Sequence, residues 1–207
     1  MEQVLNVYEQ PYNRRRPVVC FDERPCQLLG DVLMPIPMKP GRVERQDYHY
    51  TRNGTCNVLM AVEPLAGHRI VKVTEQRAKK DYAEFMKNLA AQYPDAEKII
   101  LVQDNLNTHN ASSFYEVFEA PEAFALSQRF EMIYTPKKAS WLNMAEIELS
   151  ALSKQCLDRR IDKQRVLAKE VLTWSGKRNQ LGIKIAWHFT KSKAREKLVK
   201  VYDTIKN

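Results

Sequence analysis

The segment KIILVQDNLNTHN, residues 98–110, limits the fold more than any other part of the chain. Its four consecutive aliphatic residues, 99–102, are not interrupted by any polar residue. They therefore predict a short strand that is buried on both faces. Such strands usually lie in sheets that are covered by helices on each side, which indicates an α/β fold. The strand leads to Asp104, and an unbroken polar loop follows it.

Asp104 has two interpretations at this position. An acid at the end of a buried strand is most often a turn or cap residue, because its carboxylate accepts hydrogen bonds from neighbouring backbone N–H groups. The rarer interpretation is a catalytic carboxylate. One residue does not decide between them, so the choice depends on whether the chain supplies further acids as partners.

The composition predicts one domain with a C-terminal appendage. The chain has 207 residues, 44% of them hydrophobic, which is enough for one core.

No stretch approaches the roughly 18 apolar residues of a membrane span, and the N-terminus is too polar for a signal peptide, so we expect a cytoplasmic protein. Four cysteines without C-x-x-C spacing predict reduced packing thiols rather than a zinc site or disulfides; they are Cys20, Cys26, Cys56 and Cys156.

The positive charge of the chain is concentrated in its last quarter. Residues 154–207 contain 15 Lys and Arg against 5 Asp and Glu, whereas residues 1–153 contain 18 against 20. Such a basic run is either a solvated face or a phosphate-binding surface, since Lys and Arg that displace counterions supply most of the non-specific affinity for DNA. On the second interpretation, the candidate DNA contacts here are Arg159, Arg160, Lys193 and Arg195.

The remaining sequence predicts an ordered series of strands and helices. Residue spacing and Pro or Gly breaks predict a strand over 17–23, a hairpin of two strands within 57–75, a helix over 78–93, the strand at 99–102, short helices near 112–118 and 121–128, a strand at 130–136 and a helix within 140–160. The Pro- and Gly-rich segment 30–54 fits either a long loop or an extra strand.

Two glutamates lie beside the apolar stripe of the last of these helices. At about 100° per residue, Glu146 and Glu148 fall on opposite flanks of the stripe, so periodicity alone does not choose between them. Small polar residues share the flank of Glu146 and leave room for an ion, whereas apolar residues surround Glu148. A glutamate in the first turns of a helix also commonly serves solubility or the helix dipole.

This element order is typical of a ribonuclease-H-like fold, a central mixed sheet flanked by helices, as in the catalytic cores of integrases and transposases. Asp22 ends the first strand, Asp104 follows the buried strand and a glutamate lies on the late helix. Grouped carboxylates repel one another unless cations hold them together. Mg²⁺ prefers oxygen ligands. Two such ions about 3.5–4 Å apart can activate the attacking oxygen and stabilise the leaving oxygen of a phosphoryl displacement. The sequence therefore predicts a site for Mg²⁺ or Mn²⁺, with two ions.

Several short motifs of the sequence resemble those of a known protein family. FDE, VQDNLNTH and SWLNMAEIE resemble the three acidic motifs of DDE transposases, in the bacterial insertion-sequence branch called the six-thirty family, which is related to mariner-type transposases. Further words in the same order, among them KKDYAEFM, LSKQCLDRRI and WHFT, extend the resemblance over nearly the whole chain. It implies that Asp22, Asp104 and Glu146 are the catalytic and metal-binding acids. Glu146 is chosen because LNMAE is similar to the mariner-type word LNPIE.

The resemblance also bears on residues near these acids. Asn105 and His109 fall in its QDN and TH words, where each either orients a ligand carboxylate, contacts DNA phosphate or is a hydrogen-bonded loop residue. Asn143 is expected to start a helix rather than to bind metal. The sequence departs from the family pattern at Lys138 and Ala139, where His and Gly are expected, and Lys138 is a further candidate DNA contact.

We expect an N-terminal arm or linker over residues 1–16, a catalytic core over 17–160 and a basic helical appendage over 161–207. The resemblance implies metal-dependent cleavage at transposon ends and strand transfer into target DNA, in a homodimeric DNA complex. Members of the family begin with helix-turn-helix regions, so we expect a separate upstream chain to supply them. The alternative is a truncated, non-catalytic DNA-binding or regulatory remnant, and a general nuclease of the same fold is a third, weaker hypothesis.

Overall fold

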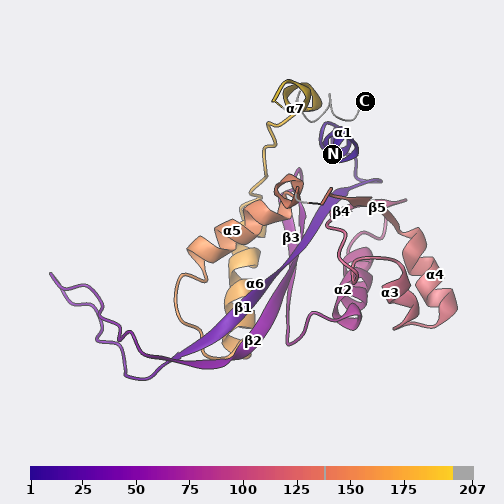
Figure 1. Ribbon diagram of the computed structural model, residues 1–207. Coiled ribbons are helices and arrows are strands. Elements are labelled where there is room, and N and C mark those ends of the chain that lie inside the picture. The colour runs from indigo at the N-terminus through magenta and orange to yellow at the C-terminus, as the bar shows by residue number, and fades with distance from the viewer. Residues whose placement is uncertain (138, 198–207) are drawn as a thin grey trace.

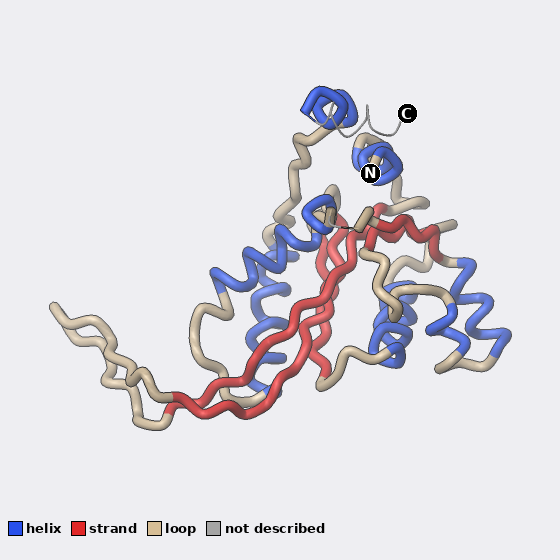
Figure 2. Tube along the Cα trace, in the orientation of Figure 1, coloured by secondary structure: helices blue, strands red, loops and turns tan. Residues whose placement is uncertain are grey.

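The computed structural model describes residues 1–137 and 139–197 as a mixed sheet with helices on both faces (Figures 1 and 2). Its five strands occur in the order β3-β2-β1-β4-β5. They are β1 (Val18–Asp31), β2 (Tyr50–Glu63), β3 (His68–Thr74), β4 (Ile99–Gln103) and β5 (Phe130–Tyr134). Strands β1, β2 and β3 pair antiparallel, whereas β4 and β5 continue the sheet parallel to β1. The predicted α/β fold with a central mixed sheet is confirmed.

Helices cover each face of the sheet in the way that the apolar strand β4 requires, since all five of its residues are buried. On one face lie α2 (Lys79–Ala91), α3 (Ser112–Tyr115) and α4 (Ala120–Gln128), and on the other lie α5 (Ala145–Gln155) and α6 (Gln164–Gln180), as Figure 1 shows. The side of α2 that carries Tyr82, Phe85, Met86 and Leu89 packs in one core cluster with Phe21, Ile99 and Leu101. Alternate residues of the same strands, Cys20, Ile100 and Val102, pack on the opposite side.

Strand β1 is longer than the sequence predicts. We expected it to end at residue 23, but it continues to Asp31 and pairs with a β2 strand that begins at Tyr50. Pro25 hides this extension because proline is unfavourable in a central strand. It is tolerated here because the pairing of β1 with β4 extends only from Val18 to Cys20, which leaves the other edge of β1 open beyond that point.

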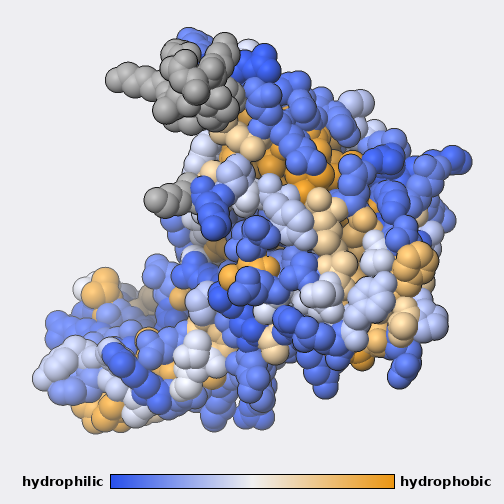
Figure 3. All heavy atoms as spheres, turned by 45° about the vertical axis from the view of Figure 1, so that its right-hand side comes forward, coloured by the Kyte–Doolittle hydropathy of each residue, from blue (hydrophilic) through white to orange (hydrophobic). Residues whose placement is uncertain are grey.

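The chain between these long strands, residues 32–49, projects from the body as an arm (Figures 1 and 2). Two isolated bridges, Ile36 with Arg45 and Lys39 with Arg42, join its two sides. The segment 30–54 is therefore part strand and part loop. Apolar side chains are exposed on the arm among polar ones (Figure 3); they include Val32, Leu33, Met34, Ile36, Met38 and Val43.

The terminal segments also pack onto the body. Within the expected arm 1–16, residues Glu2–Tyr8 form helix α1, and its Val4, Leu5 and Val7 are buried in the cluster that contains Cys20. Helix α6 lies against β3, with Leu167 and Val171 in the core. The short helix α7 (Lys191–Lys197) lies near α1. No helix in the described ranges is long and apolar enough to cross a bilayer.

Candidate active site

Asp22 and Asp104 come together because their strands are parallel neighbours. Cys20 of β1 pairs with Val102 of β4, and each aspartate follows two residues later on its own chain. Side chains alternate along a strand, so Asp22 lies on the same face as Cys20, which packs against the start of α5. Asp104 lies just beyond the end of β4, with 41% of its side chain exposed.

The third predicted acid, Glu146, lies in the first turn of α5, and Asn143 fixes that turn against the sheet. The Asn143 side chain donates to the backbone carbonyl of Phe21 (2.7 Å) and accepts from the backbone N–H of Ala145 (3.1 Å). Asn143 is thus a helix-start residue, as predicted, and it joins the start of α5 to the residue before Asp22. Its extended backbone also ends the Ser140–Leu142 turn, so the helix predicted within 140–160 begins only at Ala145.

The electrostatics of Asp22 show that the three acids act on one another. Burial, together with the negative charges of Asp104 and Glu146, raises the pKa of Asp22 from 3.8 to about 6, against a backbone hydrogen bond from Glu23 that lowers it. The pKa of Asp104 is lowered, mainly by its hydrogen bond with His109. One carboxylate is therefore crowded by negative charge while its neighbour is held ionised.

His109 is buried next to these acids, with 1% of its side chain exposed. Its Nδ1 contacts Asp104 Oδ1, and its Nε2 lies 3.4 Å from Glu23 Oε2. Burial alone would lower the pKa of His109, but its contacts with Asp104 and Glu23 outweigh burial and raise the pKa to about 9. A buried ring offers no surface to DNA phosphate, so of the three interpretations the geometry is compatible with orienting a carboxylate or with a hydrogen-bonded loop residue.

Glu23 and Arg77 also lie near the acids, although the sequence pattern did not single them out. Glu23 is almost buried, with 6% of its side chain exposed, and it pairs with Arg77 through Arg77 Nε at 2.9 Å. The only signal in the sequence was the adjacency of two acids in FDE, and alternation assigns the second acid to the opposite face of the strand.

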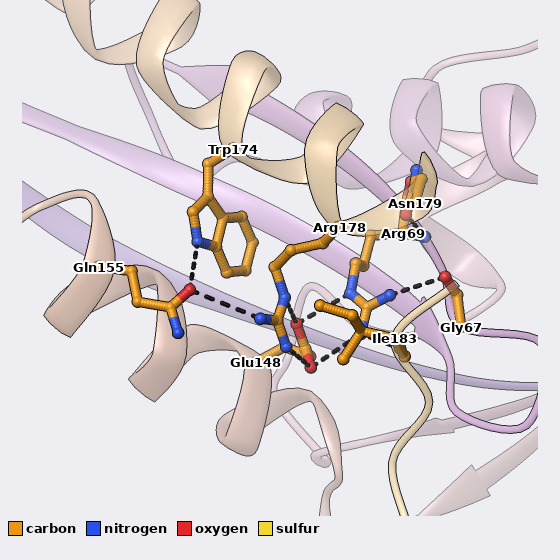
Figure 4. A network of polar contacts seen from close by, with 8 residues as sticks. All are labelled: Gly67, Arg69, Glu148, Gln155, Trp174, Arg178, Asn179 and Ile183. Atoms are coloured by element: carbon orange, nitrogen blue, oxygen red, sulfur yellow. Dashed lines mark hydrogen bonds and ion pairs between the residues drawn. The ribbon is translucent and has the colours of Figure 1, made fainter. Parts of the chain in front are cut away.

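Glu148 lies in a buried ion-pair network with Arg69 and Arg178 (Figure 4). It accepts paired hydrogen bonds from Arg69 of β3 and from Arg178 of α6, each contact 2.9–3.0 Å long. Burial would raise the pKa of Glu148, but these bonds outweigh it and lower the pKa. The network joins β3, α5 and α6, so Glu148 is already engaged by two cations. Glu146 forms no ion pair within the described chain.

Three of the predicted DNA contacts in the C-terminal region have partners within the chain. Arg159 pairs with Glu170 (2.8 Å), and the Lys193 ammonium donates to a backbone carbonyl of the same chain. Arg195 pairs with Glu2 (2.8 Å). Asn105 is exposed in the loop after β4, and Lys138 lies outside the described residues.

Arg160 has a different environment from the one we expected. Its guanidinium donates to Asp31 and to the backbone carbonyls of His49 and Asp47, and it lies over the Tyr50 ring. Arg160 therefore closes the base of the arm, and its donors are already used inside the chain.

The acids fit a divalent cation by their donor chemistry. Within residues 1–137 and 139–197, no three His, Cys, Asp or Glu side chains lie close enough to form a complete metal site. Mg²⁺, however, usually takes only one or two carboxylates and completes its shell with water and substrate phosphates. Burial, with a smaller contribution from the charges of Asp104 and Glu146, raises the pKa of Asp22, and a bound cation would offset both effects.

The pKa of Asp22 predicts a stability cost in the metal-free protein. Between pH about 4 and 6 the folded chain retains a proton that the unfolded chain has lost, so stability falls as the pH rises through this window. At pH 7.5 in EDTA we expect Asp22→Asn to be more stable than wild type by about 2–3 kcal/mol, and this gain should shrink below pH 4. Urea unfolding at several pH values measures it, with Asp95→Asn as control; equal stability at pH 7.5 would contradict the predicted crowding.

The sheet order, with Asp22 within β1 and Asp104 just beyond the end of the parallel neighbour β4, defines a ribonuclease-H-like core. Residues 17–168 match the family described as DDE superfamily endonuclease. The chain belongs to this family. No protein of curated function matches the sequence.

Solved structures show the same fold at low sequence identity. The Mos1 transposase paired-end complex with the left transposon end has a TM-score of 0.61 at 15% identity, covering 98% of this chain and 59% of the transposase. The paired-end complex of mariner Mos1 with Mg gives 0.61 at 16% identity, with 96% and 59% covered. The isolated catalytic domain of Mos1 mariner transposase gives 0.55 at 13%, with 88% and 82% covered. The chain thus spans about 59% of the length of the transposase in the first of these complexes.

Proposed function

We propose that the chain is the catalytic domain of a transposase of the bacterial six-thirty family, which cleaves phosphodiester bonds at transposon ends and joins the ends to target DNA. The observation that carries this proposal is geometric: the register of β1 and β4 brings Asp22 and Asp104 to neighbouring positions, and Asn143 fixes the start of the helix that carries Glu146 to β1, in a chain of the DDE superfamily endonuclease family. The similar structures include Mos1 complexes with a transposon end and with Mg, which support DNA and a divalent metal as partners.

In the proposed mechanism, Asp22, Asp104 and Glu146 would hold one or two divalent cations. The bound metal supplies activation of the attacking oxygen and stabilisation of the leaving oxygen. Asp104 is suited to this role because its hydrogen bond with His109 keeps it ionised at neutral pH. Asp22 is suited because a cation would offset the burial and the repulsion that raise its pKa. Asn143 keeps the start of α5, and with it Glu146, next to β1.

Cleavage of transposon-end DNA tests this function. The ends would be taken from inverted repeats flanking the coding sequence, and the chain would be assayed with Mg²⁺ or Mn²⁺, with and without an upstream helix-turn-helix chain. We expect metal-dependent nicking at the element boundary, in a homodimeric complex in the bacterial cytoplasm. Absence of cleavage even with the helix-turn-helix chain would favour the alternative, a non-catalytic DNA-binding remnant.

The basic C-terminal region predicts how the isolated chain binds DNA. Phosphate contacts dominate such binding, so affinity should fall steeply with salt and differ little between transposon-end and scrambled duplexes. Charge reversal at Arg159 or Lys193, both on the described surface, should weaken both duplexes alike and reduce the slope of log affinity against log salt by about 1. Fluorescence anisotropy at several salt concentrations measures this, with Arg14→Glu as the control outside the basic region.

A strong preference for the transposon end would contradict this prediction and would indicate a base-reading element within segment 30–54. Arg160 is excluded from the test because its reversal would break the base of the arm.

A further inference from the structure

We propose that Glu23 and His109 are positioning residues of the proposed site. Glu23 holds the imidazole of His109, and His109 holds the carboxylate of Asp104 in the orientation that binds a divalent cation. This inference rests on the proposed function and adds a supporting layer of side chains to it.

Glu23 acts from the opposite face of the sheet to Asp22. The two residues are neighbours on β1, so their side chains point to opposite faces. Phe21, on the same face as Glu23, packs with Tyr82 and Phe85 of α2. Glu23 is therefore separated from the acids around Asp22, and its influence on them has to pass through another group.

His109 is that group, because it contacts Glu23 and Asp104 with different ring nitrogens. Nε2 makes no hydrogen bond of ordinary geometry within the described chain, and the Glu23 carboxylate 3.4 Å away is the anion that faces it. Nδ1 contacts Asp104. An imidazole between two carboxylates has its orientation set by one partner while it fixes the other.

The His109 ring has little freedom to do anything else. It packs between the Phe21 and Tyr82 rings, with both centroids 5.1 Å away. The backbone carbonyl of His109 accepts from the Gln103 side chain (2.9 Å) and from the Tyr134 hydroxyl (3.1 Å). The loop that follows β4 is thus fastened at His109, six residues after the last residue of the strand, Gln103.

Asp104 needs such support because it lies beyond the paired part of β4, where no strand ladder fixes its side chain. Burying the Glu23 carboxylate is costly unless it is paired, and its partners are Arg77 and His109. The contacts run from Arg77 through Glu23 and His109 to Asp104. They connect β1 to the end of β4, the two elements that carry the aspartates.

Binding of Mn²⁺ to the purified full chain tests the inference without DNA. The free Mn²⁺ signal in electron paramagnetic resonance gives the dissociation constant, and thermal unfolding in EDTA checks that each variant is folded. Loss of a residue that orients a metal ligand typically weakens metal binding about 10- to 100-fold. We therefore expect Glu23→Gln to raise the Mn²⁺ dissociation constant at least about tenfold. Glu97→Gln, the same change at an exposed residue before β4, should leave it unchanged.

Two substitutions of His109 separate its contacts. The amide nitrogen of His109→Asn stands near the place of Nδ1 and keeps a donor for Asp104, whereas that of His109→Gln stands near Nε2 and faces Glu23. We expect His109→Gln, which loses the donor to Asp104, to lose the most affinity, and His109→Asn to lose about as much as Glu23→Gln, because both cut the contact between Glu23 and residue 109 but keep a donor for Asp104. In the His109→Asn background, Glu23→Gln should have no further effect, because the route between Glu23 and Asp104 is already cut.

The outcomes distinguish the inference from the proposed function. If wild type cleaves DNA but Glu23→Gln and His109→Gln both keep Mn²⁺ affinity within twofold of wild type, the inference is wrong and the function stands. If wild type neither binds Mn²⁺ nor cleaves DNA, both are wrong. Should Glu23→Gln fail to fold, the difference between the two His109 variants decides: equal affinities would overturn the inference.

Discussion

Asp104→Asn lowers the rate of metal-dependent cleavage at a transposon end by about a thousandfold or more, a loss of about 4 kcal/mol of transition-state stabilisation. The substitution keeps the shape of the side chain but removes the negative charge that would hold the cation. The fold should survive, because the Asp104 side chain is 41% exposed and lies outside the core. Single-turnover cleavage of a labelled duplex gives the rate, and circular dichroism checks the fold.

Asp95→Asn is the matched control for this experiment. Asp95 is exposed, pairs with Arg14 (2.7 Å) and precedes β4, at the opposite end of the strand from Asp104. We expect its cleavage rate to equal that of wild type. Equal cleavage by Asp104→Asn and wild type would exclude a catalytic role for this carboxylate, and the metal-dependent mechanism would fail with it.

Glu148→Gln destabilises the fold by about 3–5 kcal/mol, because it leaves two arginine side chains without their shared counter-charge. Arg69 is fully buried and Arg178 is 14% exposed, and both donate to the Glu148 carboxylate. The neutral amide cannot accept the paired hydrogen bonds from both guanidinium groups. Chemical denaturation at pH 7.5 measures the loss, and a change below about 1 kcal/mol would show that the network contributes little.

Glu146→Gln is the matched control, since it makes the same chemical change two residues away on the same helix. Glu146 is half-buried and forms no ion pair in the described chain. We expect this variant to lose cleavage and to keep stability close to wild type. Loss of cleavage in both variants, with loss of stability only in Glu148→Gln, would separate the two glutamates. A stable Glu146→Gln that cleaves at the wild-type rate would contradict the assignment of Glu146 as the third acid.

The sequence came close to the fold because its strands and helices differ in apolar pattern. The aliphatic run before Gln103 and the helical spacing of Tyr82, Phe85 and Leu89 identified β4 and α2 correctly. Local pattern did not reveal the far half of β1, because Pro25 and Gly30 interrupt the usual strand signal. Whether such residues are tolerated depends on which edge of the strand is paired, and that is decided by other parts of the chain.

By itself, the sequence determined most of the element order and placed Asp104 at the end of β4, since the aliphatic run shows where that strand ends. It did not show that β1 continues past Asp22 to Asp31. Only the tertiary structure decided which acids have partners. Glu148 is neutralised by Arg69 and Arg178, residues from distant segments, and Glu23 reaches Asp104 only through His109. Periodicity gives the face on which a side chain lies. The charged partners of that side chain come from other elements that pack against the same face. Spacing along one helix or strand carries no information about those elements.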